Sequence, residues 1–164
     1  MPIVFHTSNI YKILEEVKDP EVPVISIIDL GIVRDVALVE DSLHISITPT
    51  YSGCPAMKEI EEDIKSVLHE IGFDKVKIIT VLSPAWTTDW LSKEGREKLR
   101  AYGIAPPVGT SVDKSALFAE PKKISCPQCS SENTKMISQF GSTSCKALYS
   151  CEDCKEPFDY FKCI

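Results

Sequence analysis

Two pairs of cysteines near the C-terminal end are the residues whose type and spacing point most directly to chemistry. The first pair is Cys126 and Cys129, the second is Cys151 and Cys154, and 21 residues lie between the pairs. Two residues between thiols allow a tight turn to direct both sulfurs at one ion, and two such turns supply the four thiolates of a tetrahedral zinc site. We therefore expect the four cysteines to hold a structural zinc ion as the cofactor of a zinc ribbon.

The same four ligands leave other chemistry open. A rubredoxin-like iron site also uses four thiolates, and ligand type alone does not separate iron from structural zinc. A redox CxxC pair is a further alternative, but such pairs usually accompany a βαβ pattern, which we do not expect in this chain. Cys145 and Cys163 remain as additional thiols. They are either small buried side chains or a second pair that holds iron or a cluster transiently.

The seventh cysteine, Cys54, lies alone in the first part of the chain, in the segment TPTYSGCPAM. Gly53 permits a sharp turn, and Pro55 favours the first turn of a helix. We therefore expect Cys54 at or beside the N-terminal cap of that helix, where free backbone N–H groups and the helix dipole favour an anion. Several acidic side chains in the first turns of the helix oppose this effect. The placement alone therefore leaves two interpretations open, a reactive or metal-binding thiol and an ordinary thiol without a function.

Periodicity predicts the elements that precede Cys54. Apolar side chains over Ile10–Val17 recur at helical spacing, and Thr7 or Ser8 is available as the N-terminal cap. Apolar and polar residues alternate over Leu43–Ile47, which predicts a strand that pairs with Ile32–Val39 as a hairpin. Between these elements lies Asp29, directly before Leu30 and Gly31, and its simplest role is that of an Asx-type turn residue.

The elements that follow Cys54 complete a small domain. A second helix is predicted from Pro55 to Gly72, followed by a strand over Lys75–Leu82. A short helix is predicted over Lys93–Tyr102, with Ser92 as its cap. This order of elements predicts an α+β fold, in which a two-layer domain with a mixed sheet precedes a β-rich zinc ribbon.

Composition divides the chain into three parts. Residues 1–104 contain 11 basic and 17 acidic side chains, whereas residues 105–164 contain seven of each. Three prolines and the absence of a helical period predict a linker over residues 105–122. The last part, residues 123–164, is too short to bury an adequate core. It therefore needs a further source of stability, which its cysteines can supply by cross-linking the segment. We expect its ribbon arms over Lys135–Phe140 and Ala147–Ser150.

Composition also excludes several classes of function. A formal charge of −6 argues against a nucleic-acid partner, because such binding depends on cations that neutralise phosphates. No apolar run approaches the roughly 20 residues that cross a bilayer, so we expect no membrane partner. The N-terminus lacks the basic and apolar regions of a signal peptide. We therefore expect a cytoplasmic protein, in a reducing compartment where clustered cysteines bind metal more often than they form disulfides.

Three motifs of the first domain resemble a known family. They are DPEVPV (Asp19–Val24), DLGIV (Asp29–Val33) and TPTYSGCPAM (Thr48–Met57). Together they resemble the small domains that include SufT and related proteins of iron–sulfur cluster assembly. With the SPAWTTDW segment and the cysteine-rich tail, the whole chain is similar to the PaaD-like family of phenylacetate degradation. One departure is that CPQCS and CEDCK lack the glycine that is common after zinc-ribbon cysteines.

The resemblance implies a function that the residues alone do not show. PaaD-like proteins are encoded with the multicomponent phenylacetyl-CoA epoxidase, a monooxygenase complex with a di-iron oxygenase and a reductase that contains flavin and an iron–sulfur cluster. We expect a non-catalytic accessory factor that assists maturation or maintenance of these centres. Its expected partners are the oxygenase and reductase components or other iron–sulfur assembly proteins. The alternative is a direct epoxidase subunit with an electron-transfer role through an iron-loaded ribbon.

The resemblance also assigns roles to two residues of the first domain. In related domains the cysteine of the SGCP motif is the functional thiol, which corresponds to Cys54. The acidic residue of the DLG motif corresponds to Asp29. Cys54, either alone or together with Cys145 or Cys163, would then hold iron or an iron–sulfur cluster in transit to a client protein.

Overall fold

The computed structural model describes residues 6–108 and 123–162. The chain divides into two compact units, which we call unit 1 (Met1–Trp86) and unit 2 (Thr87–Ile164). The division comes earlier than the boundary expected at residue 104. The reason is that the helix over residues 93–102 contacts the two-residue strand after it, and this strand pairs with the last strand of the ribbon. Of the expected linker, residues 109–122 lie outside the described residues.

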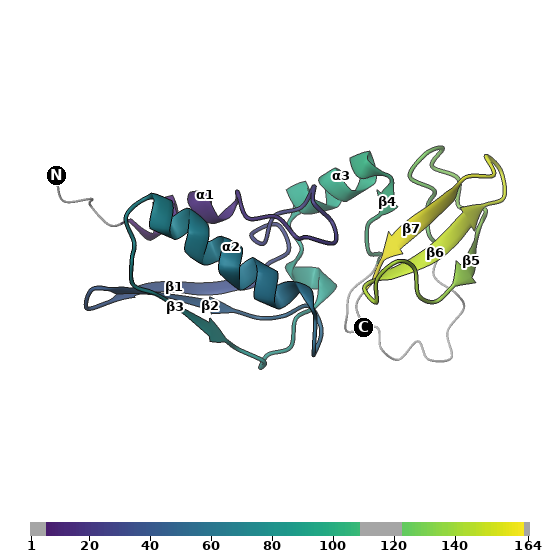
Figure 1. Ribbon diagram of the computed structural model, residues 1–164. Helices are drawn as coiled ribbons and strands as arrows, with labels where there is room; N and C mark the ends of the chain where they lie inside the picture. The colour runs from purple at the N-terminus through teal and green to yellow at the C-terminus, as the bar shows by residue number, and fades with distance from the viewer. Residues whose placement is uncertain (1–5, 109–122, 163–164) are drawn as a thin grey trace. The chain divides into compact units, whose positions relative to one another are not determined.

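Unit 1 is a three-stranded mixed sheet with two helices on one face (Figure 1). The helices are α1 (Thr7–Leu14) and α2 (Ala56–Glu70), and the strands are β1 (Val33–Val39), β2 (Ser42–Ile47) and β3 (Val76–Thr80). Strands β1 and β2 form the expected antiparallel hairpin, whereas β2 and β3 are parallel. Because α2 connects the two parallel strands, unit 1 contains a βαβ crossover. The expectation that the chain lacks this pattern is wrong, although the crossover contains neither CxxC pair.

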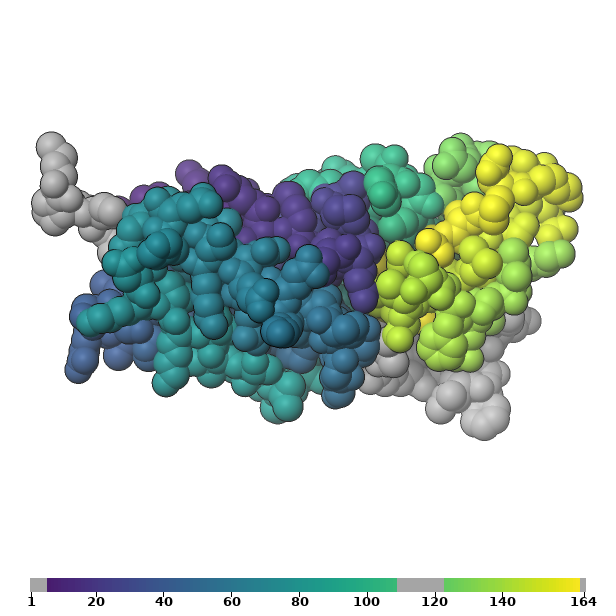
Figure 2. Space-filling model, in the orientation of Figure 1, coloured from purple at the N-terminus to yellow at the C-terminus, as the bar shows by residue number. Residues whose placement is uncertain are grey.

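The core of unit 1 lies between the sheet and the helices. In β2 the fully buried Leu43, Ile45 and Ile47 alternate with half-buried residues, as a strand with one covered face requires. The opposing face of α2 contributes four buried residues at helical spacing: Ala56, Ile60, Ile64 and Leu68. Figure 2 shows the side chains of α1 and α2 on the surface of unit 1, where the two helices cover one face of the sheet.

The segment between α1 and β1 is ordered by bonds from side chains to the backbone. Oδ1 of Asp19 accepts hydrogen bonds from the backbone N–H groups of Glu21 and Val22, at 2.8 and 2.9 Å. Ser26 and Asp29 form a reciprocal pair. The N–H of Ser26 donates to Oδ2 of Asp29 at 3.1 Å, and the N–H of Asp29 donates to Oγ of Ser26 at 3.0 Å. Asp29 is thus a turn residue, in agreement with the sequence.

The N-terminus of α1 differs from the prediction. Its cap residue is His6, and no side chain makes a capping hydrogen bond. The carbonyl oxygen of His6 accepts the N–H of Asn9 at 2.9 Å, so the helix already contains Thr7 and Ser8. The prediction of Thr7 or Ser8 as the cap is therefore wrong by one or two residues.

Helix α3 (Lys93–Tyr102) has the ends that the sequence predicts. Oγ of Ser92 accepts the N–H of Gly95 at 2.9 Å, which satisfies one of the free donors of the first turn. Gly103 follows the helix with a φ of 91°, a left-handed conformation that suits glycine. In the part of the chain that the structure describes, the longest helix is α2, with 15 residues. No helix within residues 6–108 and 123–162 is long and apolar enough to cross a membrane.

In unit 2, a four-stranded sheet follows α3. Its elements besides α3 are the short helix η1 (Thr88–Trp90) and the strands β4 (Ile104–Ala105), β5 (Thr134–Ser138), β6 (Lys146–Cys151) and β7 (Pro157–Phe161). The strand order is β4-β7-β6-β5, with β4 parallel to β7 and the other neighbours antiparallel (Figure 1). Strands β5 and β6 are the two expected ribbon arms, and β7 lies within the aromatic segment EPFDYF.

Candidate metal centre

The two cysteine pairs lie in turns with the same backbone hydrogen bonds. In the first turn, the N–H of Cys126 donates to the carbonyl oxygen of Ser131 at 2.8 Å. In the second, the N–H of Cys151 donates to the carbonyl oxygen of Glu156 at 3.0 Å, again five residues later. We call these turns the first knuckle (Cys126–Ser131) and the second knuckle (Cys151–Glu156). The two turns thus share one pattern of backbone hydrogen bonds.

The residue after the second cysteine of each knuckle has a left-handed backbone. Ser130 has a φ of 63° and Lys155 a φ of 66°. Their N–H groups donate to the carbonyl oxygens of Cys126 and Cys151, at 2.8 and 3.1 Å, and so close the turns. A non-glycine residue adopts this conformation only where the surroundings hold it there. Zinc ribbons commonly have a glycine after the second cysteine of a knuckle. Here Ser130 and Lys155 occupy these positions, and both adopt the left-handed conformation that glycine favours.

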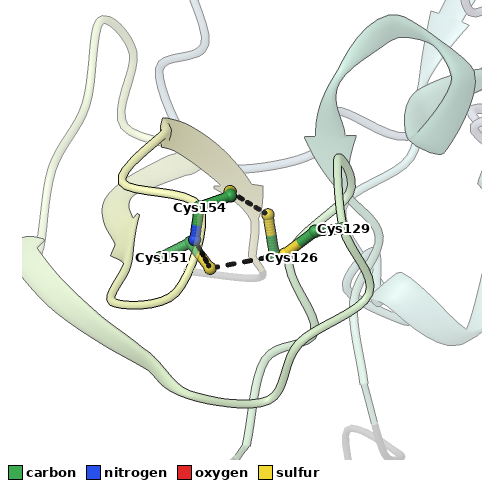
Figure 3. Close-up of side chains that lie close together, drawn as sticks. All are labelled: Cys126, Cys129, Cys151 and Cys154. Carbon is green, nitrogen blue, oxygen red and sulfur yellow. Dashed lines mark hydrogen bonds between the residues drawn. The ribbon is translucent and has the colours of Figure 1, made fainter.

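The four sulfurs converge on one point (Figure 3). Sγ of Cys126 is 3.7 Å from Sγ of Cys154, Sγ of Cys129 is 3.5 Å from Sγ of Cys151, and all four lie within 4.8 Å of one another. Thiolates bound to one tetrahedral zinc ion at about 2.3 Å lie about 3.8 Å apart. Cysteines that bind a multi-iron cluster are distributed over several iron atoms, which spreads their sulfurs further. The site therefore fits a single tetrahedral ion.

The electrostatics of the second knuckle favour a thiolate at Cys151. The N–H of Cys154 donates to Sγ of Cys151 at 3.5 Å. This bond, aided by the backbone of Asp153 and opposed by burial, lowers the pKa of Cys151 to about 7. The pKa of Cys154 is raised to about 12, because burial and the three neighbouring thiols outweigh the lowering effect of the Glu156 backbone. Without a cation the cluster thus retains protons, and a bound metal ion would displace them.

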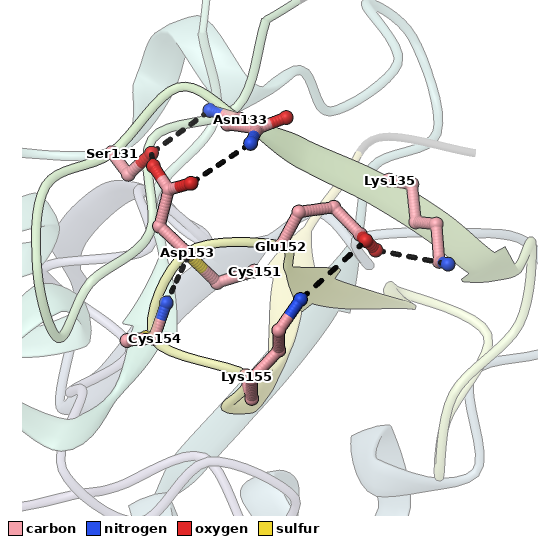
Figure 4. Close-up of polar contacts among 8 residues, drawn as sticks. All are labelled: Ser131, Asn133, Lys135, Cys151, Glu152, Asp153, Cys154 and Lys155. Carbon is pink, nitrogen blue, oxygen red and sulfur yellow. Dashed lines mark hydrogen bonds and ion pairs between the residues drawn. The ribbon is translucent and has the colours of Figure 1, made fainter.

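Polar side chains connect the two knuckles to each other (Figure 4). Asp153 accepts a hydrogen bond from Oγ of Ser131 and another from Nδ2 of Asn133, the latter at 2.9 Å. These two bonds lower the pKa of Asp153. The N–H of Glu152 donates to the carbonyl oxygen of Asn133 at 2.8 Å, and its carboxylate pairs with Nζ of Lys135 at 2.9 Å. The network holds the knuckles in register, and no local sequence pattern predicts any of its members.

The apolar cluster beside the site is small and includes two of the four cysteines. Its buried members are Ala105, Ile124, Cys126, Cys151 and Phe158. Cys126 and Cys151 are 2% and 0% exposed, so half of the sulfur cluster also belongs to the core. A core of this size does not hold a module of about 40 residues together without a metal or a disulfide.

Cys145, the remaining described thiol of unit 2, does not lie in the site. Cys145 is 7% exposed, and its Sγ lies 3.0 Å from Oγ1 of Thr143. Within the described residues, the sulfur cluster comprises the four knuckle cysteines without Cys145. Cys163 lies outside the described residues, so the pairing of Cys145 with Cys163 stays a prediction.

Cys54 lies directly before the N-terminus of α2, as the sequence predicts. The cap residue is Pro55, and Gly53 turns the chain with a φ of 74°. The thiol is half-buried, with Oγ1 of Thr50 at 4.0 Å from Sγ. The carbonyl oxygen of Cys54 accepts the N–H of Met57 at 3.3 Å, which fixes the backbone of the loop against the helix. The loop thus presents a single, partly accessible thiol directly before the helix.

Comparison with known proteins separates the chain into the same two parts. Residues 7–81 match the family of iron-sulfur cluster assembly proteins, and residues 110–162 match the PaaD zinc beta ribbon domain. The chain is 40% identical over 87 residues to the Fe-S protein maturation auxiliary factor YitW of Bacillus subtilis (strain 168), which covers 52% of this chain and 84% of that protein. The crystal structure of a domain of unknown function, DUF59, from Bacillus anthracis matches with a TM-score of 0.52 and 32% identity, over 56% of this chain and 89% of that one.

A further relative spans both parts. The chain is 48% identical over 156 residues to a protein of Escherichia coli (strain K12) that is provisionally named as one of the subunits of 1,2-phenylacetyl-CoA epoxidase, and the match covers 95% of this chain and 92% of the relative. Fold and site together define a class of protein in which an iron–sulfur assembly domain precedes a zinc ribbon with four cysteines. Within that class, the chain belongs to the PaaD family, which includes this relative.

Proposed function

We propose that this chain is an accessory factor of a multicomponent phenylacetyl-CoA epoxidase, and that it assists maturation or maintenance of the iron or iron–sulfur centres of that complex. The main support is that one chain combines an assembly-type domain with a PaaD ribbon. The names of its relatives agree with both halves, since one is named as part of an epoxidase and another as a maturation factor. The proposed partners are the oxygenase and reductase components or other iron–sulfur assembly proteins, in the cytoplasm.

In this proposal Cys54 is the thiol that binds iron or an iron–sulfur cluster before its transfer to a client protein. A site that passes iron or a cluster to a client must be accessible and must leave ligand positions open. Cys54 is half-buried and supplies one sulfur, so the other ligands would come from the client or from a second protein. Asp29 would act through the turn that it forms with Ser26, which precedes β1 in the same unit.

The ribbon would have a different task. Its four sulfurs leave no open ligand position on a tetrahedral ion, and two of them are almost fully buried. A closed site of this kind contributes folding energy and has no position for a substrate. We therefore assign zinc to the four cysteines, with the ribbon as a structural module that docks a partner. The four-thiolate geometry also fits iron, which is the observation that favours an electron-transfer subunit as the second candidate.

The visible absorption spectrum of anaerobically purified protein separates these two functions. We expect a colourless protein with about one equivalent of zinc, because zinc has a filled d shell and no redox chemistry. The measurement combines the spectrum with elemental analysis of protein that was never exposed to chelators. A reversible chromophore typical of four-thiolate iron would contradict the zinc assignment and support the electron-transfer role.

Limited alkylation at neutral pH tests the role of Cys54. We expect Cys54 to react first in the metal-loaded protein, because the knuckle thiols are held by the metal and Cys145 is buried. The labelled peptide is identified by mass spectrometry, and Cys54→Ser serves as the control in which this first label disappears. An inert Cys54 with preferential labelling of Cys163 would reject the assignment.

A further inference from the structure

Three cations lie together on one side of α3. Lys93, Arg96 and Arg100 follow one another at spacings of three and four residues, which places them on the same face of the helix. They line a cavity of ≈ 370 Å³ in unit 2. Among the described residues that line it, Glu97 is the one carboxylate. The rest of the wall is largely apolar and includes Ala105, Pro106, Pro107, Val108 and Ile124.

Arg96 is fixed in place by neutral partners. Its Nη1 donates to the carbonyl oxygen of Pro107 at 2.7 Å, and its Nη2 donates to the carbonyl oxygen of Thr88 at 2.8 Å. A guanidinium has five N–H donors, so three remain beyond these two bonds to described residues. Because both partners are carbonyl groups, the hydrogen bonds orient the guanidinium without neutralising its charge.

The positive charge of this face is not compensated by ion pairs. Across residues 6–108 and 123–162, no salt bridge involves Lys93, Arg96 or Arg100. Unit 2 as a whole contains 11 basic and 10 acidic side chains, so it has no general excess of cations. The chain has a net charge of −6 and would repel anions elsewhere on its surface. The three cations are therefore a local concentration of positive charge at this cavity.

We propose that this cavity binds a small phosphorylated molecule. Arginine forks match phosphate oxygens in a bidentate geometry, and an arginine that is already held in position loses little freedom on binding. Three cations facing one carboxylate suit a ligand with more than one negative charge, and the proline-lined wall suits its less polar part. The volume falls in the range of about 300–1,000 Å³ typical of small-molecule sites. This inference goes beyond the proposed maturation role and does not depend on it.

Binding is tested on the full-length, metal-loaded chain by isothermal titration calorimetry, with inorganic pyrophosphate and ADP as probes. We expect one site, with an affinity that falls as salt rises. Arg100→Gln should weaken binding about tenfold or more, because a charge-assisted hydrogen bond is lost. Arg100 is exposed, so this variant should keep the fold, which a thermal melt checks. Arg96→Gln should also weaken binding, but it removes two structural hydrogen bonds as well.

The matched control is Lys77→Gln, which makes the same change of charge at an exposed position of β3 in unit 1. It should leave the affinity of both probes within about twofold, because a charge outside the cavity contributes only through the screened field of the whole protein. Absence of binding for both probes would overturn the proposal. Equal weakening by Lys77→Gln and Arg100→Gln would overturn it too, as would tighter binding of a glutamate-rich peptide than of either probe.

Discussion

Replacing Cys151 by serine is expected to abolish metal binding and to unfold the ribbon while unit 1 stays folded. Cys151 is fully buried, belongs to the small apolar cluster and accepts the N–H of Cys154. A serine hydroxyl is a poor ligand for zinc, so the variant loses binding energy that is worth about 10–16 kcal/mol in zinc-finger peptides. The remaining core of unit 2 is too small to compensate for such a loss.

Limited proteolysis with mass spectrometry, together with elemental analysis, measures this effect. The variant should be cleaved rapidly between Lys123 and Lys162, whereas the core of unit 1 should resist. Cys145→Ser is the matched control, since Cys145 is also buried but lies outside the sulfur cluster, and it should retain the metal. Less than about a tenth of an equivalent of any transition metal in native wild-type protein would contradict the metal site itself.

Replacing Cys54 by alanine is expected to reproduce a deletion of the whole gene without unfolding the protein. The thiol is half-buried, and the described contact of its sulfur is the long one to Thr50. Its removal should cost no more than about 0.5–2 kcal/mol, the range for loss of a helix cap. Cells with this variant should fail to grow on phenylacetate while growth on unrelated carbon sources continues.

The control for this variant is Ser52→Ala, two residues earlier in the same loop and exposed. It should support growth on phenylacetate, because it leaves the thiol in place. The thermal stability of both purified variants shows whether a growth defect has a structural origin. Normal growth with Cys54→Ala would reject Cys54 as the functional thiol.

Local patterns in the sequence predicted the elements that depend on neighbouring residues. The hairpin of β1 and β2 follows from alternation, α3 from its Ser92 cap and Gly103, and the cysteine cluster from the paired CxxC spacing. In each case the signal lies within a few residues of the structure that it specifies. The placement of Cys54 before α2 was predictable for the same reason, since Gly53 and Pro55 flank it.

Features that depend on distant residues were not predictable. Strand β4 has two residues, and its pairing with Asp159 and Tyr160 joins segments that are 55 residues apart. This pairing is why unit 2 begins before α3 instead of after it. In the same way, the indole N–H of Trp86 donates to the carbonyl oxygen of Leu30 at 2.7 Å, a contact across 56 residues that no local pattern contains.

The candidate site shows the same division between near and distant residues. Spacing identified the four cysteines of the cluster, because each knuckle is a local turn. The hydrogen bonds from Ser131 and Asn133 to Asp153 were not identified, because serine, asparagine and aspartate are common in turns and their spacing has no signature. The left-handed backbones of Ser130 and Lys155 were also missed, since neither residue type indicates a positive φ.

The most direct test of the proposed function is the iron and cluster content of the epoxidase components isolated from cells that lack this chain. The proposed role predicts that the oxygenase and reductase polypeptides are present but poorly metallated. Restoring the chain should restore their metal content, and the Cys54→Ala variant should not. Fully metallated components that stay inactive until the purified chain is added would contradict maturation and would identify an electron-transfer subunit instead.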